Sequence, residues 1–274
     1  MTQATTSSPV ATITASSDKK RGRLFLVPAP LDFGCEQQAA LEDALPRATI
    51  GQAAQLSHWI CENAKSTRAY LKRVDAIQAL ATPIQAQQIT ELPREVHKKG
   101  DHGDKGASVL DARPLLAAAL QGHDMGLVSE AGMPAVADPG SSIVRAAHDL
   151  EIPVVPLVGP VSLLLALAAS GMNGQNFAFV GYLPQSVQER AQRIRELESF
   201  ALKTGQTQVF IETPYRNAAL WQALTQTLQT NTRLAMAAGL TLESAKLCSL
   251  PVKQWRQRGI PVDNRTPTVF MIGR

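Results

Sequence analysis

The stretch that decides the fold reads Gly126-Leu-Val-Ser-Glu-Ala-Gly-Met-Pro-Ala-Val-Ala-Asp-Pro-Gly-Ser141. Its apolar start, 126–129, predicts a buried strand. Small and turn-forming residues follow at 130–140 and predict a loop, and 142–150 predicts a helix with Ser141 as its N-cap. In a parallel α/β sheet, ligands bind outside the carboxyl ends of the strands. We therefore expect this loop to line a ligand site.

Two glycines and a turn signature in this loop support two interpretations. Gly132 and Gly140 lack a Cβ atom, so the backbone there can approach a ligand closely. Asp138-Pro-Gly140 is also an ordinary turn signature, and a purely structural turn explains it equally well.

A second stretch repeats the pattern and reads Val154-Val-Pro-Leu-Val-Gly-Pro-Val-Ser162. It predicts a strand, a glycine turn and a helix start, with Ser162 placed to cap the helix or to donate to a ligand. Two such strand ends near an inferred domain junction at Gly159 predict a cleft between domains.

Outward from these stretches, strands and helices alternate, which predicts an α/β fold with largely parallel sheets. Further strands are expected at 24–27, 154–158, 177–180, 208–211, 234–237 and 268–272. Further helices are expected at 36–45, 65–80, 114–121, 161–170, 187–200 and 217–228. The economical division is a disordered tail at 1–22, an N-terminal α/β domain at 23–159 and a C-terminal α/β domain at 160–274.

The segment 94–106 is charged and contains three glycines, which predicts a mobile loop. Our hypothesis is that it orders over bound RNA through four basic or imidazole side chains: His97, Lys98, Lys99 and Lys105.

The composition excludes several classes of protein. The 274 residues are 45% hydrophobic and 18% charged, with a net charge of +4, and no apolar run approaches the roughly 20 residues of a transmembrane helix. Cys35, Cys61 and Cys248 are odd in number and far apart, so we expect neither a disulfide framework nor a zinc cluster, and a reducing cytoplasm. The chain has no GxxxxGK[ST], HExxH, CxxC or GxSxG motif and no GxGxxG after a strand. Nucleotide hydrolysis, zinc chemistry and triad hydrolysis are therefore not expected.

Several motifs resemble those of the tetrapyrrole methylase superfamily of S-adenosylmethionine-dependent methyltransferases. They read LVSEAGMPAVADPG at 127–140, VVPLVGPVSLLLALAASGM at 154–172, FVGYLP at 179–184, IETPYR at 211–216 and PTVFMIG at 267–273. Within the superfamily, the likeness points to the branch that methylates a cytidine ribose 2′-hydroxyl of small-subunit ribosomal RNA. It spans about residues 24 to 273.

Three polar motifs depart from that branch. Its first loop reads TPIGNLxD, whereas 29–34 reads APLDFG. Its AEDTRHTRxLL aligns with CENAKSTRAYL at 61–71, and its RELTK becomes AGLTL at 238–242. The motifs of the cofactor loops therefore match, while those expected to face the substrate differ.

The resemblance implies two α/β/α domains, a homodimer, and S-adenosylmethionine in the cleft between the domains. It implies a set of cofactor-binding residues: Pro30, Ser129, Glu130, Ala131, Gly132, Met133, Asp138, Ser141, Gly159, Ser162, Leu183, Met236, Pro267 and Thr268. Substrate contacts are expected from Lys65, Arg68 and Arg216. A ribose hydroxyl benefits from a nearby base, for which Glu62 and Glu130 are the candidates, and no catalytic residue is assigned.

The resulting prediction is a cytoplasmic methyltransferase acting on ribosomal or other structured RNA. The altered polar motifs also allow a diverged paralogue that binds the cofactor or RNA without turnover. A third possibility is methylation of a small molecule such as a tetrapyrrole.

Overall fold

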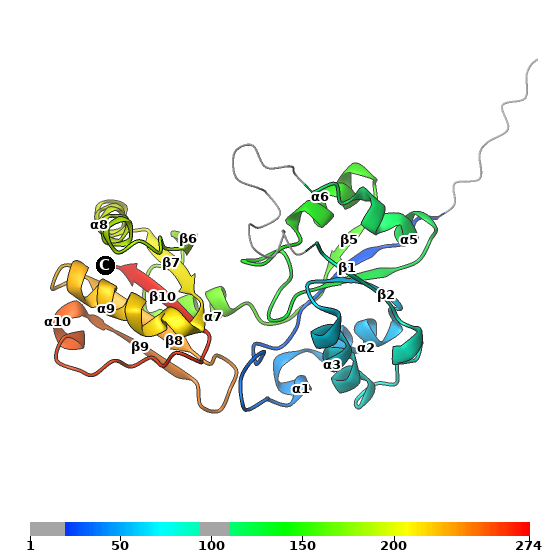
Figure 1. Ribbon diagram of the computed structural model, residues 1–274, viewed down its shortest axis with the longest axis horizontal. Helices are drawn as coiled ribbons and strands as arrows, with labels where there is room; N and C mark the ends of the chain where they lie inside the picture. The colour runs from blue at the N-terminus through cyan, green and yellow to red at the C-terminus, as the bar shows by residue number, and fades with distance from the viewer. Residues whose placement is uncertain (1–19, 94–109) are drawn as a thin grey trace, which may run out of the picture.

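The computed structural model describes residues 20–93 and 110–274, and each half of the chain contains a five-stranded sheet (Figure 1). The predicted mobile loop 94–106 and nearly all of the predicted tail 1–22 lie outside the described residues.

The first sheet is entirely parallel and has the order β3-β2-β4-β1-β5. Its strands are β1 (Leu24–Val27), β2 (His58–Cys61), β3 (Gln88–Glu91), β4 (Met125–Val128) and β5 (Val154–Pro156). Because the strands are parallel, all their carboxyl ends meet at one edge of the sheet.

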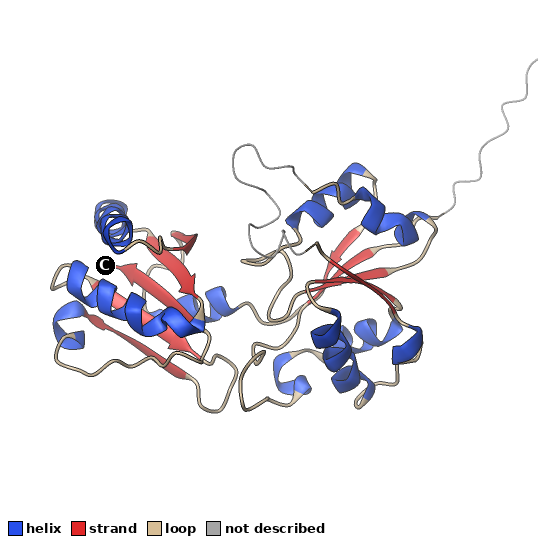
Figure 2. Ribbon diagram, viewed as in Figure 1, coloured by secondary structure: helices blue, strands red, loops and turns tan. Residues whose placement is uncertain are grey.

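Helices cover both faces of the first sheet (Figure 2). The face that presents Phe25 and Trp59 packs against α1 (Leu41–Ala44), α2 (Arg47–Gln55) and α3 (Ala64–Asp75). The face that presents Leu24 and Ile60 packs against η2 (Arg113–Leu116), α5 (Ala117–Leu120) and α6 (Ser141–Asp149). A short turn, η1 (Ile84–Ala86), precedes β3.

The second sheet has the order β6-β7-β10-β8-β9. Its strands are β6 (Phe177–Tyr182), β7 (Thr207–Glu212), β8 (Arg233–Ala238), β9 (Lys246–Pro251) and β10 (Thr268–Gly273). One face packs against α8 (Val187–Thr204), α9 (Asn217–Thr227) and α10 (Val252–Trp255). The other packs against α7 (Ser162–Ser170), and η3 (Pro214–Arg216) follows β7. Both halves are therefore layered α/β/α structures, which confirms the predicted fold class.

The prediction of largely parallel sheets is wrong for the second half. Only β6 and β7 run parallel there, and β10 pairs antiparallel with both β7 and β8. For the β8–β9 pair the cause is the connection between these strands, which spans only residues 239–245. A parallel pair needs a crossover of about a dozen residues or more, so this connection forms an antiparallel pair instead.

The helix predicted at 114–121 forms as the 3-10 turn η2 followed by the short α5, and two other helices are shorter than predicted. The helix predicted at 36–45 forms only at Leu41–Ala44, because the Ala39 carbonyl accepts a hydrogen bond from Arg73 Nη2 at 2.8 Å instead of from a helical N–H. The helix predicted at 65–80 ends at Asp75, whose Oδ1 accepts from the backbone N–H of Leu80 at 3.0 Å. The sequence reading missed α2, α10, β2, β3 and β9.

Neither predicted serine cap forms. α6 begins at Ser141 and its N-cap is Gly140, while α7 begins at Ser162 and its N-cap is Val161. Neither N-cap side chain accepts a capping hydrogen bond. Both serines therefore occupy the first helical position, one residue later than predicted.

Candidate ligand site between the two halves

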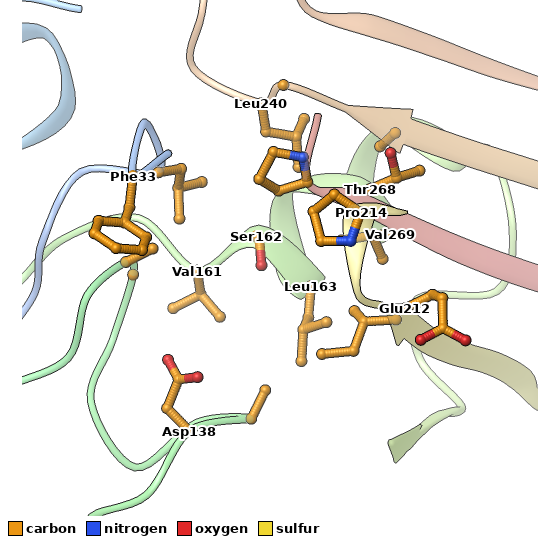
Figure 3. A pocket seen from close by; sticks show the side chains of 18 of the residues that line it. Phe33, Asp138, Val161, Ser162, Leu163, Glu212, Pro214, Leu240, Thr268 and Val269 are labelled. Carbon is orange, nitrogen blue, oxygen red and sulfur yellow. The ribbon is translucent and has the colours of Figure 1, made fainter. Parts of the chain in front are cut away.

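A cavity of about 390 Å³ lies where the two halves meet. The first half contributes Leu31, Phe33 and Gly34 from the loop after β1 and residues 131–133 and 136–138 from the loop after β4. The second half contributes the start of α7, the ends of β7 and β8, and the start of β10 (Figure 3). Its volume falls within the roughly 300–1,000 Å³ of small-molecule sites. The predicted cleft at the carboxyl edge of the first sheet is present.

The loop after β4 is held against the loop after β1 by a two-way backbone bridge. The Ala29 N–H donates to the Gly132 carbonyl at 2.9 Å, and the Gly132 N–H donates to the Ala29 carbonyl at 3.0 Å. Gly132 has φ +71°, and a Cβ added there would lie 3.3 Å from Leu31 Cδ2. The bridge therefore fixes the part of the loop that needs glycine, at the wall of the cavity.

The same loop carries backbone strain at two alanines. Ala135 and Ala137 both have φ +65°, a left-handed conformation that costs a non-glycine residue about 1–2 kcal/mol. Ala137 lines the cavity. Strain of this kind persists only where the surrounding structure enforces it, and it clusters at ligand sites.

The cavity is electronegative on the side of this loop. Burial, followed by the charges of Glu62 and Glu130, raises the pKa of the Asp138 carboxyl to about 7. Burial, followed by the charges of Asp138 and Glu212, also raises the pKa of the Tyr182 hydroxyl. A cationic group placed here would relieve the repulsion that raises the pKa of Asp138.

At the end of β7, Glu212 is buried and forms a charge-assisted pair with Arg216. Arg216 Nη2 and Nε donate to Glu212 Oε1 at 2.6 and 3.0 Å, and Nε also donates to Thr213 Oγ1 at 3.1 Å. The guanidinium lies 5.5 Å from the ring centroid of Tyr215. These contacts fix the wall of the cavity formed by Glu212, Thr213 and Pro214.

The structure brings about half of the predicted cofactor-binding residues to the cavity wall. Those that line it are Ala131, Gly132, Met133, Asp138, Ser162, Pro267 and Thr268. Those that do not line it are Pro30, Ser129, Glu130, Ser141, Gly159, Leu183 and Met236.

Three of the residues that do not line the cavity pack against other parts of the fold. Met236 and Leu183 belong to the core beneath α8 and α9, on the face of the sheet opposite the one that contains Ala237. Gly159 packs on Pro28, where a Cβ would approach within 2.3 Å.

None of the predicted catalytic and substrate residues lines the cavity. Glu62 Oε1 accepts from the backbone N–H of Glu130 at 3.3 Å, which ties the Glu62 carboxylate to the start of the loop after β4. Lys65 and Arg68 are exposed on α3. Arg216 donates hydrogen bonds to Glu212, which lines the cavity.

Sequence reasoning missed several lining residues: Leu31, Phe33, Tyr182, Glu212 and Leu240. Tyr182 and Glu212 stand at the ends of strands inside FVGYLP and IETPYR, so these motifs could have predicted them as lining residues. No motif could have predicted Phe33, because its loop departs from the resembling motif.

Fold and cavity together define a class: layered α/β proteins of two sheets with a ligand-sized cavity between their halves. Residues 63–254 match the family described as Tetrapyrrole (Corrin/Porphyrin) Methylases. The chain belongs to this family.

Similar proteins agree with this assignment. Over 132 residues the chain is 39% identical to "Ribosomal RNA small subunit methyltransferase I" of Mesorhizobium japonicum, covering 48% of this chain and 44% of that protein. It is 30% identical over 198 residues to the protein of the same name from Halalkalibacterium halodurans, covering 72% and 57%. The chain spans about half the length of these curated relatives.

A solved structure shares the fold. The methyltransferase CobJ superposes with a TM-score of 0.55 at 14% identity, covering 92% of this chain and 94% of that one.

Proposed function

We propose that the protein is a cytoplasmic S-adenosylmethionine-dependent methyltransferase. Its proposed substrate is small-subunit ribosomal RNA, with a ribose 2′-hydroxyl as the acceptor. The observation that carries this proposal is the electronegative cavity at the strand ends of a tetrapyrrole methylase fold. The RNA substrate is inferred from the names of the relatives.

The residues of the cavity fit an adenosyl cofactor. Val161, Leu163 and Leu240 give it apolar walls suited to an adenine ring. The strained loop at 131–138 brings backbone to the wall. Burial and then the neighbouring carboxylates raise the pKa of Asp138, and a sulfonium or ammonium charge would stabilise its anion. Bound there, the cofactor would supply an activated methyl group.

Methyl transfer from a sulfonium is an in-line displacement, in which positioning supplies much of the rate. Glu62 and Glu130 remain the proposed candidates for a hydrogen-bond acceptor to the attacking hydroxyl. Glu130 stands near the start of the loop after β4, and the Glu62 carboxylate accepts a hydrogen bond from its backbone N–H.

Basic side chains exposed on α3 support an RNA substrate. Lys65, Arg68 and Lys72 project from the exposed face of α3, whose opposite face is buried by Tyr70 and Leu71. Phosphate contacts from such a face give affinity without sequence selectivity.

Asn63 stands where the resembling motif has aspartate, and it still caps α3. Its Oδ1 accepts from the backbone N–H groups of Lys65 and Ser66 at 2.8 and 3.3 Å.

The changed motif at 238–242 favours a second candidate, a paralogue that binds the cofactor without turnover. Ala238 and Leu242 are buried apolar residues where the resembling family has charged ones. Charge-assisted hydrogen bonds contribute roughly 1.5–3 kcal/mol each, so their loss lowers catalysis on the original substrate unless other groups compensate.

The decisive experiment mixes purified protein and labelled S-adenosylmethionine with small ribosomal subunits from a strain that lacks this ribose methyl. Label transfer to a ribose 2′-oxygen is expected. Cofactor binding without transfer to subunits or total RNA selects the paralogue, and no cofactor binding overturns both readings.

We further propose that the protein is a homodimer. α7 covers only part of one face of the second sheet, and exposed apolar side chains surround it: Leu164, Leu165, Phe177, Phe179 and Leu247. Val180 and Cys248 pack into the opposite core, so by strand alternation Phe179 and Leu247 face the α7 side. Exposed apolar side chains on one face fit a second copy of the chain.

A further inference from the structure

The loop after β1 forms one edge of the cavity, and we define residues 31–36 as the lip. Leu31, Phe33 and Gly34 of the lip line the cavity. The Phe33 ring lies at the side formed by the first half, across the cavity from Glu212 and Pro214 (Figure 3). Although Phe33 lines a cavity, 45% of its surface is exposed. A large apolar ring is therefore presented at the mouth.

The lip is anchored to α3 by a buried ion pair. Arg73 Nη1 and Nη2 donate to Asp32 Oδ1 and Oδ2 at 3.1 and 3.0 Å. Asp32 is only 3% exposed. Arg73 Nη2 also donates to the Ala39 carbonyl at 2.8 Å. Planar, two-point pairing of this kind fixes orientation as well as distance, so Asp32 has little freedom to move away from α3.

The lip has a much weaker ion pair with the second half. Arg265 Nη1 lies 3.3 Å from Glu36 Oε1, and both side chains are more than four-fifths exposed. Exposed pairs of this kind contribute little. The lip is thus a part of the first half that reaches to the boundary with the second.

The resembling family's first loop has glycine and asparagine where this chain has Asp32 and Phe33. The buried acid that binds Arg73 and the exposed ring at the mouth stand at neighbouring positions. Both departures therefore lie in the lip.

We propose that Phe33 contacts the substrate at the cavity mouth by stacking on a nucleobase next to the acceptor ribose, and that Arg73, acting through Asp32, is the positioning residue that holds the ring there. This inference rests on the proposed function. An aromatic face accepts any base, and stacking is largely independent of sequence, so the ring contributes binding and placement of the RNA rather than choice of its sequence.

The test compares Phe33→Leu with Phe33→Tyr, and with Phe200→Leu as the matched control. Phe200 is 49% exposed on α8 and does not line the cavity. The measurements are binding of unmethylated small ribosomal subunits by filter retention, kcat and KM for methyl transfer, and S-adenosylmethionine binding by calorimetry. Phe33→Leu should raise Kd and KM for subunits about tenfold, a larger factor than any change in the Kd for S-adenosylmethionine. Phe33→Tyr should bind subunits more tightly than Phe33→Leu does, and Phe200→Leu should match the wild type.

The Arg73 arm uses Arg73→Gln, Arg73→Lys and the double variant Asp32→Asn/Arg73→Gln, which leaves no lone buried charge if the single variant fails to fold. Amide hydrogen exchange of residues 31–36 should rise in the Gln variants and be partly restored in Arg73→Lys. The weakening of subunit binding should follow the same order.

The outcomes separate this inference from the proposed function. A wild type that binds neither cofactor nor subunits overturns both. A wild type that methylates subunits while Phe33→Leu binds them normally overturns the stacking role alone. Unchanged exchange of the lip in a folded Arg73 variant overturns the positioning role.

Discussion

At the scale of single residues, Asp138 has the unusual property of being stabilised in its protonated form. In the unfolded chain an aspartate ionises near pH 4, whereas burial and two neighbouring carboxylates raise the pKa of Asp138 to about 7 in the fold. Folding therefore takes up a proton between these pH values. Because the native state then binds more protons, stability falls as the pH rises from about 4 through about 7, and the loss is complete above that.

Replacing Asp138 by Asn should remove this dependence, since the amide is neutral at every pH. Urea unfolding of both proteins at pH 5 and pH 8, without ligand, measures the effect. The wild type should lose about 2–3 kcal/mol relative to Asp138→Asn between the two values. A difference between the proteins that does not change with pH would show that the carboxyl titrates normally.

Gly132 gives a second prediction at this scale. Gly132→Val puts a branched side chain at φ +71° and within 3.3 Å of Leu31, so the loop must move away from the cavity wall. We expect at least a tenfold loss of S-adenosylmethionine affinity by calorimetry, with an unchanged circular dichroism spectrum. Gly174→Val is the control, because a Cβ there meets nothing within 4 Å. Equal affinities would remove this loop from the cofactor site.

At the scale of secondary-structure elements, what could be predicted depended on how local the cause is. The strand at 24–27 and the helix at 162–170 follow from short apolar runs bounded by proline or glycine, and the sequence reading found both within one residue. The loop after β4 was placed at the cavity because strand, loop and helix follow one another directly.

What could not be predicted depends on distant partners. Asp32 and Arg73 are 41 residues apart, and nothing in either neighbourhood indicates the pair that shortens α1 and anchors the lip. The antiparallel second sheet likewise depends on the final strand entering between β7 and β8, which no local pattern encodes. Half of the cofactor-binding residues predicted from the resemblance lie outside the cavity wall. A residue's position in a motif does not determine which face of the sheet its side chain occupies.

The basic face of α3 supplies a prediction at the element scale. Replacing Lys65, Arg68 and Lys72 by Gln removes three exposed positive charges and leaves the buried face and the Asn63 cap unchanged. Binding to small ribosomal subunits should weaken, and the slope of log affinity against log salt should become shallower by about 2–3. Filter binding at several salt concentrations measures this, with S-adenosylmethionine affinity as the internal control. An unchanged slope would remove α3 from the RNA interface.

At the scale of the whole molecule, no helix in the described ranges is both long and apolar enough to cross a membrane. Within the same residues, no group of three or more His, Cys, Asp or Glu side chains could hold a metal ion. The large apolar side chains left exposed around α7 are the surface that most needs a partner.

Leu165→Glu places a charge in the centre of that surface. If two copies pack there, light scattering should show a monomer for this variant and a dimer for the wild type. Leu120→Glu is the matched control, since Leu120 is 40% exposed on α5 of the other half and Leu165 is 41% exposed. A wild-type monomer, or a dimer that survives Leu165→Glu, would contradict the proposed interface.

The central place of β10 has a consequence for biosynthesis. This strand comes after every other strand in the chain, yet it lies in the middle of the second sheet and carries Pro267 and Thr268 beside it to the cavity. A nascent chain emerges from its N-terminal end, and its parts fold in that order. All strands of the first half are therefore made early, whereas one edge of β7 and one edge of β8 stay unpaired until β10 has been made. The cavity wall therefore closes only after β10 has been made, so a nascent chain that ends before β10 lacks a finished ligand site.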